Sequence, residues 1–574
     1  MRNYFFLSIS LIVGLVLLIL IYLSTYGIKT NKFNKLINDR VKKFDKNLSL
    51  ETEDVYLKLK LDDKSIKIET INPKIFSGEN FIELSKIEAN LDLIKILKNE
   101  KSLKKVEIKT KENSIKKLNN FINSYKFNLT QFIIFNQIEK GNAKITAHIY
   151  FDQENQNNYK YRITGKINEA KINIINKKFI DNINFNFEIE DQNVFFKNIY
   201  LKYDNIDFES KKITISRLKN DFRVKGDIKN KKNIVNIKSI SKLFNLNFDF
   251  IDQEEILLET NNNFSFNIDT KRKIKDLSYN SNLIFDKIII NKKYQDLIFL
   301  SDGKIQTEYS NKNLKIKVDS EYSFINKEYN TQDDEKNIKI NINKNNNENF
   351  KIESFIKNKK TKINSKELGK YFQIDKKYFK DQTIIFGSDS KINFNIDKNN
   401  KVKNLKIKSN INFESLKIDY ISSKLKKRIP NYQDHFFLNS EYLELDYKNN
   451  KTQIKAKGKY SFNDKFEDYE INIINQKDQY KFDSSINFKN NLINIEEIDY
   501  KKGKDTSSVI KLKGHYIKNK DIIIDHAIYS EDKNKIAISN LQLSKDYKIK
   551  DIDALELNYL NKNKKLNFLK ISKI

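Results

Sequence analysis

The chain has 574 residues and a net charge of +31, from 107 basic and 76 acidic side chains, and it contains no cysteine. This length exceeds that of one compact domain, although an elongated sheet escapes the limit because its cross-section stays constant as it grows. The lysines are spread along nearly every strand and turn, whereas nucleic-acid-binding proteins concentrate them in a patch or arm. The composition therefore argues against a nucleic-acid partner and excludes a disulfide framework.

The first expected element is a membrane-spanning helix between Phe5 and Tyr26, within a segment 1–28. The stretch is uncharged and overwhelmingly apolar, and it matches the ~20 residues that a helix needs to cross the hydrocarbon core. Its apolar core is longer than that of a cleaved signal peptide, and residues 23–27 (LSTYG) make a poor small-x-small cleavage site. We expect an uncleaved signal anchor, whose membrane-facing residues include Phe5, Leu11, Leu17, Ile21 and Tyr26.

The charges that flank this helix leave its orientation open. Arg2 precedes the helix, and seven basic residues follow it between Lys29 and Lys46. Taken literally, the positive-inside rule keeps the large domain in the cytoplasm, but long domains translocate largely regardless of charge. Residues 29–49 are expected to form a basic connector that is helical in part. It either lies on anionic headgroups or is a solvated linker.

Residues 50–125 combine strands with short helical runs. Val55, Leu57 and Leu59 alternate with polar residues up to the turn at 62–64, which predicts a hairpin with one apolar face. Residues 93–98 carry apolar side chains at mixed spacing and predict a short helix. Residues 103–108 then return to a strand pattern.

The order of these elements resembles the amino-terminal region of the AsmA family, which includes the TamB-like and YhdP-like envelope proteins. The resemblance covers roughly the first 110 residues and is one of pattern and placement. It is carried by residues 87–98 (IEANLDLIKILK) and 103–108 (LKKVEI). The chain departs from the family in having only 12 glycines and 2 prolines. The resemblance implies a groove-forming protein of the bacterial inner membrane. Its bulk would lie in the periplasm, and it would move phospholipid between the inner and outer membranes.

Residues 126–574 repeat the two-residue alternation almost without interruption. Residues 264–290 and 392–418, 128 positions apart, share eleven of 27 residues, and each reads as a β-meander. Residues 240–246 and 368–374 are two short, helix-like apolar clusters that overlay in the same register, so the repeat units run from about 234 to 290 and from about 362 to 418. Asp269 and Asp397 end the first strand of each copy and are expected to cap the turn. The polar stretches 325–350 and 425–435 are expected to be loops.

These patterns predict a mainly β fold. We expect an elongated, curved antiparallel sheet with few short helices, preceded by one transmembrane helix. The apolar face must lie against a second sheet, a helix or a ligand, and alternation looks the same in a closed sandwich and an open trough. The resemblance favours a trough that holds phospholipid acyl chains. The candidate lipid-groove residues are Val55, Leu57, Leu59, Phe185, Phe187, Phe266, Ile268, Phe394 and Ile396.

The sequence nominates no catalytic or cofactor site. The four histidines are not at metal-ligand spacing, and no phosphate-binding glycine motif appears. Paired carboxylates such as Asp62–Asp63 fall in polar turns. We therefore expect neither an enzyme nor a cofactor. The alternative to lipid transport is an envelope scaffold that assists outer-membrane protein assembly, or that binds acidic envelope polymers through its lysines.

Overall fold

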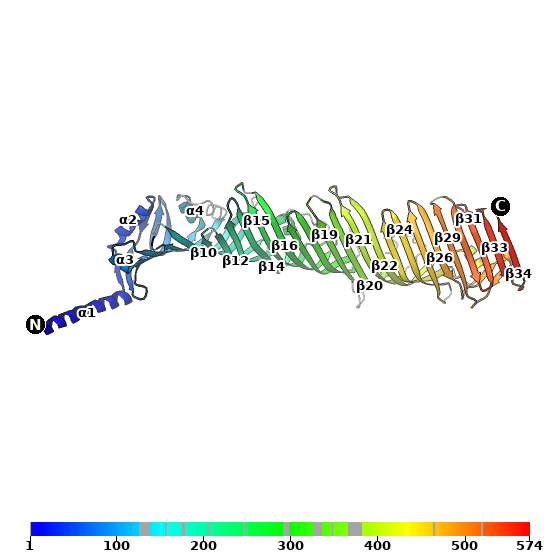
Figure 1. Cartoon of the computed structure of the whole chain (residues 1–574), viewed down its shortest axis with the longest axis horizontal. Helices are drawn as coiled ribbons and strands as arrows, with labels where there is room; N and C mark the ends of the chain where they lie inside the picture. The colour runs from blue at the N-terminus through cyan, green and yellow to red at the C-terminus, as the bar shows by residue number, and fades with distance from the viewer. Residues whose placement is uncertain are drawn as a thin grey trace. The chain divides into compact units, whose positions relative to one another are not determined.

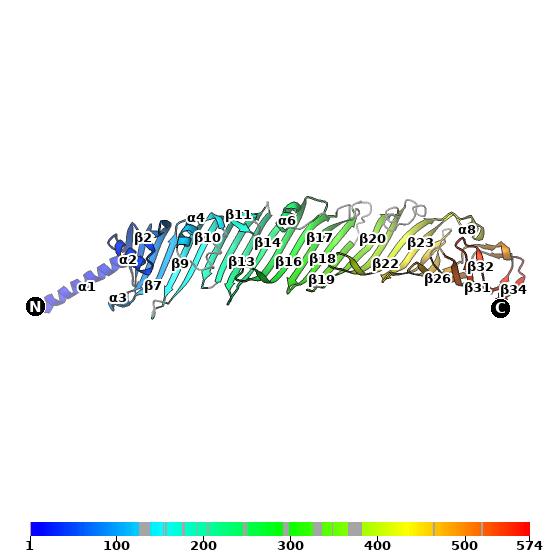
Figure 2. The same ribbon diagram turned by 90° about the horizontal axis from the view of Figure 1, so that it is seen from above.

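The computed structural model of the chain is shown from two sides in Figures 1 and 2. It describes residues 2–124, 138–152, 154, 158–174, 178–191, 193–203, 206–244, 248, 251–271, 273–290, 298–324, 336–346, 348–365, 382–462, 465–517 and 520–573. The fold is mainly β, with open antiparallel pairing and few short helices after one apolar N-terminal helix. The predicted fold class is thus confirmed. The chain divides into one unit of Met1–Ser239 with Leu257–Asn282, and a second of Ile240–Ile256 with Leu283–Ile574.

The first unit begins with helix α1 (Arg2–Thr25), which is long and apolar enough to span a membrane. Two residues later the chain enters strand β1 (Ile28–Thr30), which pairs with β3 (Asp54–Lys60). Gly27 makes this sharp entry possible: its φ is +70°, and a Cβ there would lie 2.6 Å from the carbonyl oxygen of Leu57.

The basic connector is more ordered than a solvated linker. It contains β1, helix α2 (Asn34–Phe44) and the start of β2 (Leu48–Glu51), and β2 pairs with β5 (Lys74–Ser77). The side-chain amide of Asn34 also donates hydrogen bonds to the carbonyl oxygens of Thr52 and Glu53, at 2.9 and 3.1 Å. Residues 29–49 therefore belong to the folded unit.

The remaining strands of the first unit pair in antiparallel order from β3 to β14, with β5 and β8 as short side branches. Their bounds are β4 (Ser65–Ile71), β6 (Asn80–Asp92), β7 (Leu103–Thr110), β8 (Asn113–Ser114), β9 (Ile138–Phe151), β10 (Tyr159–Ile174), β11 (Lys178–Glu190), β12 (Asn193–Tyr203), β13 (Ile206–Arg217) and β14 (Phe222–Asn236). The predicted hairpin at 62–64 joins β3 to β4. The predicted short helix is α3 (Leu93–Leu97). Helix α4 (Ile115–Ser124) buries Ile115, Leu118 and Ile122 in the core of this unit.

In the second unit most strands again pair with the next strand along the chain (Figure 1). The exceptions are β26, which pairs with β29, and β31, which pairs with β33 as well as with β32. Their bounds are β17 (Ile298–Ser310), β18 (Asn313–Phe324), β19 (Lys336–Lys344), β20 (Phe350–Asn364), β21 (Thr383–Ile396), β22 (Val402–Asp419), β23 (His435–Lys448), β24 (Lys451–Ser461), β25 (Glu467–Gln476), β26 (Gln479–Asn487), β29 (Ser508–Ile517), β30 (Ile522–Glu531), β31 (Asn534–Leu543), β32 (Ile549–Asp551), β33 (Ala554–Leu560) and β34 (Leu566–Ser572).

The sequence repeat is also a repeat of strand bounds. Strands β14 and β20 begin and end 128 positions apart, and so do β15 (Glu255–Ile268) and β21. Strands β16 (Ile274–Ile289) and β22 begin at the same interval. Residues 240–244 complete helix α6 (Ile237–Phe244), as the apolar cluster predicted, whereas 368–374 lie outside the described residues.

The prediction of a loop at 325–350 is wrong in part. Residues 325–335 lie outside the described residues, but 336–344 form β19 instead of a loop. Ile338, Ile340 and Ile342 are every second residue of β19, which is the alternation of a strand. Each is paired with a residue of β18 on one side and of β20 on the other. The second expected loop holds the short helix α8 (Ser423–Arg428) and then residues without strand structure.

Bulges interrupt the long ladders in both units. Register shifts occur within β10–β11, β13–β14, β17–β18, β20–β21, β22–β23 and β29–β30. Several bulges place Asn or Asp in the left-handed region, among them Asn182, Asp302 and Asn404, with φ of 57°, 47° and 55°. Asn and Asp tolerate this conformation better than other side chains, and a bulge bends its strand and increases its twist. Curvature is therefore built into strands that contain almost no glycine or proline.

Candidate functional site: the apolar face

In the first unit, cross-strand pairing aligns apolar side chains into a continuous row. Directly opposed residues lie on the same face of a sheet, so such a row marks one face as it passes from strand to strand. From β3 to β14 the row comprises Val55, Thr70, Ile87, Ile108, Ala147, Ile163, Ile189, Val194, Ile215 and Val224. Every member except Thr70 is apolar.

The second unit carries the same kind of row in two overlapping parts that meet on β22. From β17 to β22 it comprises Ile305, Val318, Ile340, Ser354, Ile392 and Ile407. From β22 to β34 it comprises Ile411, Leu443, Ala456, Ile471, Ser484, Leu512, Ala527, Ile538, Leu555 and Ile571. Ile407 and Ile411 are four residues apart in one strand and therefore face the same side.

The two faces of the second unit differ in polarity. Along the apolar rows nearly every side chain is half-buried. The alternating residues on the other face are mostly polar, and they are either exposed, such as Lys455 and Lys457 of β24, or half-buried, such as Asn395 of β21. The described strands lie next to their ladder partners in one layer (Figure 1). An apolar face that is only half-buried on a single-layer sheet can accept an apolar ligand.

The predicted groove residues fall into a buried and a half-buried group. Val55, Leu59, Phe185 and Phe187 are at most 8% exposed, and the two phenylalanines belong to the core that α4 also joins. The half-buried candidates are Leu57, Phe266, Ile268, Phe394 and Ile396. Phe394 lies opposite Ile352, and Ile396 lies between Phe350 and Val402. The half-buried residues are the ones positioned to contact a ligand.

Sequence reasoning missed four glycines that face phenylalanine rings. A Cβ built on Gly165, Gly226, Gly303 or Gly514 would lie within 3.0 Å of ring atoms of Phe187, Phe264, Phe285 or Phe482, respectively. Two of these pairs, Gly165 with Phe187 and Gly514 with Phe482, are directly opposed in their ladders. A ring can lie over a glycine because there is no side chain to hold it away from the sheet. The only signal in the sequence is an isolated glycine within an alternating strand.

The opposite face of the first unit carries a network of ion pairs. Glu107 lies 2.7 Å from the Nζ of Lys109, 3.6 Å from that of Lys86 and 3.4 Å from the Nδ1 of His148. Partial burial alone would raise the pKa of Glu107. The hydrogen bond from Lys109 and the charges of Lys109, Lys86 and His148 outweigh it and lower that pKa to about 2. This face is polar, and the carboxylate of Glu107 on it is paired with basic side chains.

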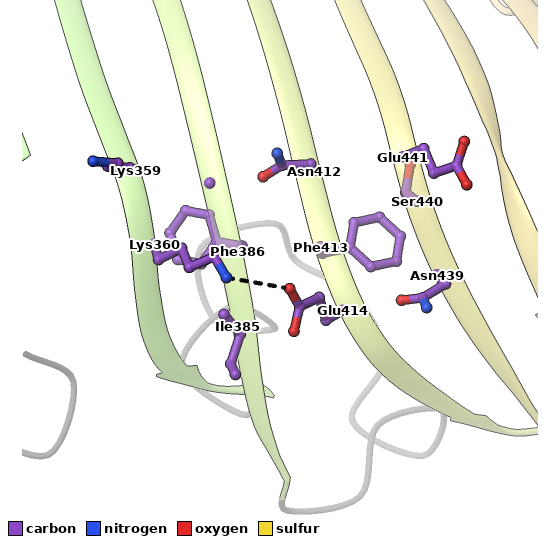
Figure 3. Close-up of a pocket in the computed structure, with 11 residues that line it drawn as sticks. Lys359, Lys360, Ile385, Phe386, Asn412, Phe413, Glu414, Asn439, Ser440 and Glu441 are labelled. Atoms are coloured by element: carbon purple, nitrogen blue, oxygen red, sulfur yellow. Dashed lines mark ion pairs between the residues drawn. The ribbon is translucent and has the colours of Figure 1, made fainter. Parts of the chain in front are cut away.

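A polar hollow of about 350 Å³ opens where bulges interrupt β20, β22 and β23 (Figure 3). Lys360 and Glu414 form an ion pair of 3.8 Å across it. Phe386 and Phe413, which are directly opposed in the ladder, lie beside this pair. Ser440 and Glu441 also line the hollow. Among the residues that the structure describes, no three His, Asp or Glu side chains are grouped to hold a metal ion.

Two inserted segments cover part of the apolar face of the second unit. We call residues 420–434 and 488–507 together the cap. The second segment contains β27 (Ile493–Ile495), the 3-10 helix η4 (Glu496–Ile498) and β28 (Tyr500–Lys502). Apolar side chains of both cap segments form one buried cluster with side chains of β30 and β33. The cluster comprises Ile429, Tyr432, Phe488, Ile493, Tyr500, Tyr529, Leu557 and Tyr559.

Polar contacts fasten the cap to itself and to the sheet. Within the cap, Lys427 pairs with Glu496 at 2.6 Å and Arg428 pairs with Glu497. On the sheet side, the hydroxyl of Tyr559 donates a hydrogen bond to the carbonyl oxygen of Ile498 at 2.5 Å, and Lys562 pairs with Asp499 at 2.7 Å.

Two charged groups are buried here, Lys502 within the cap and Glu467 of β25 beneath it. Lys502 has no exposed surface, and its ammonium donates to the carbonyl oxygens of Lys489, Asn491 and Gly503 at 3.1, 3.0 and 2.9 Å. Glu467, 5% exposed, accepts from the backbone N–H of Asn490 at 2.8 Å and the side-chain amide of Asn491 at 2.7 Å. Burial lowers the pKa of Lys502 and raises that of Glu467.

Comparisons with protein-family models, with curated proteins and with solved structures find no match to this chain. The resemblance to the AsmA family therefore stays a prediction from pattern and placement. The observed geometry itself provides an apolar face on a single-layer sheet and one helix able to cross a membrane.

Proposed function

We propose that this chain is a membrane-anchored, non-catalytic carrier of phospholipid in a bacterial envelope. Helix α1 would anchor it in the inner membrane, with the bulk of the chain in the periplasm. The half-buried apolar face would hold acyl chains on their way between inner and outer membranes while headgroups stay in water. The AsmA resemblance supports the envelope location.

One observation carries this proposal. Apolar rows pass from strand to strand between β17 and β34, and nearly all of their side chains stay half-buried on a sheet one layer thick. A sealed sandwich would bury these side chains fully against a second sheet. An acyl chain lying along the row would instead complete their burial, at roughly 25 cal/mol per Å² of apolar surface removed from water.

The test is photo-crosslinking from two adjacent positions on opposite faces. Benzoylphenylalanine replaces Phe394 on the apolar face in one full-length variant and Asn395 on the polar face in the other; both native residues are half-buried. After irradiation in envelope-containing cells, mass spectrometry of the protein should find phospholipid adducts at position 394 and not at 395. Equal adducts at both positions, or none at 394, would refute the proposal.

A scaffold that assists outer-membrane protein assembly, or binds acidic polymers, is the second candidate, favoured by the net charge of +31. It predicts protein or polymer adducts at position 395 and partner binding that weakens strongly with salt. The same pair of variants therefore separates the two functions.

A further inference from the structure

The candidate membrane helix is joined to the first unit without a flexible linker. Only Tyr26 and Gly27 lie between α1 and β1, and the hydroxyl of Tyr56 donates a hydrogen bond to the carbonyl oxygen of Tyr26. In the ladder, Ile28 pairs with Leu57 and Thr30 with Val55. Going back from Ile28 toward α1, the antiparallel chain therefore runs toward the end of β3 at Lys60. This end of the sheet lies on the same side as the membrane helix.

The same end of the sheet presents three large aliphatic side chains to solvent. The β3–β4 turn begins with Leu61, two residues beyond Leu59 and hence ~7 Å further along the strand direction. Helix α3 starts where β6 ends, and the N–H of Leu93 donates to the carbonyl oxygen of Lys64 at 3.0 Å. The exposed fractions of Leu61, Ile94 and Leu97 are 51%, 46% and 79%. We call these three residues the apolar tip.

Helix α3 presents Ile94 and Leu97, its two residues of the apolar tip, to solvent. Ile94 and Leu97 are three residues apart and lie on one side of the helix. The carboxylate of Asp92 caps the helix by accepting from the N–H of Lys95 at 3.1 Å, and it pairs with Lys104 at 3.2 Å. These contacts fix the helix against the sheet while leaving Leu97 exposed.

Charged side chains surround the apolar tip, and basic ones outnumber acidic ones. Lys64, Lys98 and Lys101 are exposed and Lys60 and Lys95 are half-buried, whereas the exposed acidic residues are Asp62, Asp63 and Glu100. Basic side chains next to apolar ones at a bilayer surface bind anionic headgroups while the apolar side chains enter the boundary with the acyl chains. A solvated loop does not require exposed leucines at this position.

We propose that the apolar tip inserts into the headgroup region of the bilayer that α1 crosses, with anionic phospholipid as its partner. This inference rests on the proposed membrane anchoring. It gives the first unit a second membrane contact, about 15 Å to the side of β1 by the spacing of neighbouring strands. Two contacts fix the direction in which the apolar face leaves the membrane, whereas one helix alone would let the unit pivot.

The chain contains no tryptophan, so a single introduced one reports on its own surroundings. Full-length Leu97→Trp is reconstituted into vesicles of phosphatidylglycerol and brominated phosphatidylcholine. Leu17→Trp in α1 is the positive control. Ile234→Trp is the negative control, since Ile234 is 63% exposed in β14, nine ladder steps or ~43 Å across the sheet from β3.

We expect blue-shifted, strongly quenched emission from Leu97→Trp and Leu17→Trp, and none of either effect from Ile234→Trp. Adding Lys64→Glu, Lys98→Glu and Lys101→Glu to Leu97→Trp should reduce its quenching at least twofold. Quenching at position 17 without quenching at 97 overturns the tip and leaves the anchor standing. No quenching at 17 overturns both. Quenching at position 234 as strong as that at position 97 overturns the proposal that the apolar tip is a specific membrane contact. Crosslinking at position 394 reports on the apolar face independently of these outcomes.

Discussion

Asp269 and Asp397, 128 positions apart, hold the same turn in the two copies of the repeat. Each carboxylate accepts hydrogen bonds from the backbone N–H groups two and four positions later, at 2.9–3.0 Å. Each also pairs with the lysine six positions later, at 3.1 Å in both copies. The backbone hydrogen bond from four positions later is the largest cause that lowers the pKa of each carboxyl. The predicted capping role of both residues is therefore confirmed by geometry.

Removing the Asp397 carboxylate should loosen its turn. In Asp397→Ala the N–H groups of Asn399 and Lys401 lose their acceptor, so we expect their deuterium exchange to be about tenfold faster. Asp397→Asn keeps one acceptor oxygen and should give an intermediate rate. Asp269→Ala should have the same effect on its own turn only. Unchanged exchange in both alanine variants would contradict the shared role.

Alternation predicted the strands well because it depends on local sequence alone. Val55, Leu57 and Leu59 indicated β3, and Leu93 to Lys98 indicated α3, since the period changes where the structure does. The prediction of a loop at 336–344 failed for a local reason. Asn and Lys occupy every exposed position of β19, and their abundance conceals three correctly spaced isoleucines.

Features that depend on pairing between distant residues could not be predicted. Alternation does not set the register between strands, and the contact of Phe187 with Gly165 depends on that register. The cap joins segments about 60 positions apart, and neither shows a pattern that indicates the other. Lys502 was unpredictable for a different reason: lysine is almost never fully buried, so composition assigns it to the surface.

A methyl group under a phenylalanine ring should destabilise the second unit. In Gly303→Ala the new Cβ would meet the ring of Phe285, so the ring must move, which costs about 2 kcal/mol in the free energy of unfolding. Combining it with Phe285→Leu should recover part of this loss in a double-mutant cycle measured by urea denaturation. Gly503→Ala is the matched control, because no atom lies within 4 Å of its Cβ position. Additive effects of the two changes would argue against direct contact.

Acid should weaken the first unit through Glu107. Its pKa of about 2 in the folded chain lies below its ordinary value of 4.5, so the unfolded chain binds more protons between these pH values. The stabilisation is complete above about pH 4.5 and is lost as the pH falls through about 2. Thermal midpoints of Glu107→Gln, measured by circular dichroism, should be lower than wild type at pH 7 and converge with it near pH 2. Glu79→Gln, in an exposed turn, should keep the wild-type pH profile, and a Glu107→Gln profile parallel to wild type would contradict the assignment.

The buried ammonium of Lys502 should hold the cap segment 488–507 together, because all three of its carbonyl acceptors lie within that segment. Lys502→Met removes the donor to three backbone carbonyl oxygens, each of which is then left without that partner at a cost of ~1 kcal/mol or more, so we expect local opening to become easier by about 3 kcal/mol. Hydrogen–deuterium exchange should increase in peptides covering 488–507 and stay unchanged in peptides of β18 and β19. Lys501→Met changes the neighbouring exposed lysine and should leave exchange as in wild type. Exchange in 488–507 that is as slow in Lys502→Met as in wild type would contradict this role of the ammonium. Apolar packing of Tyr500 and Ile493 would then be sufficient to hold the segment.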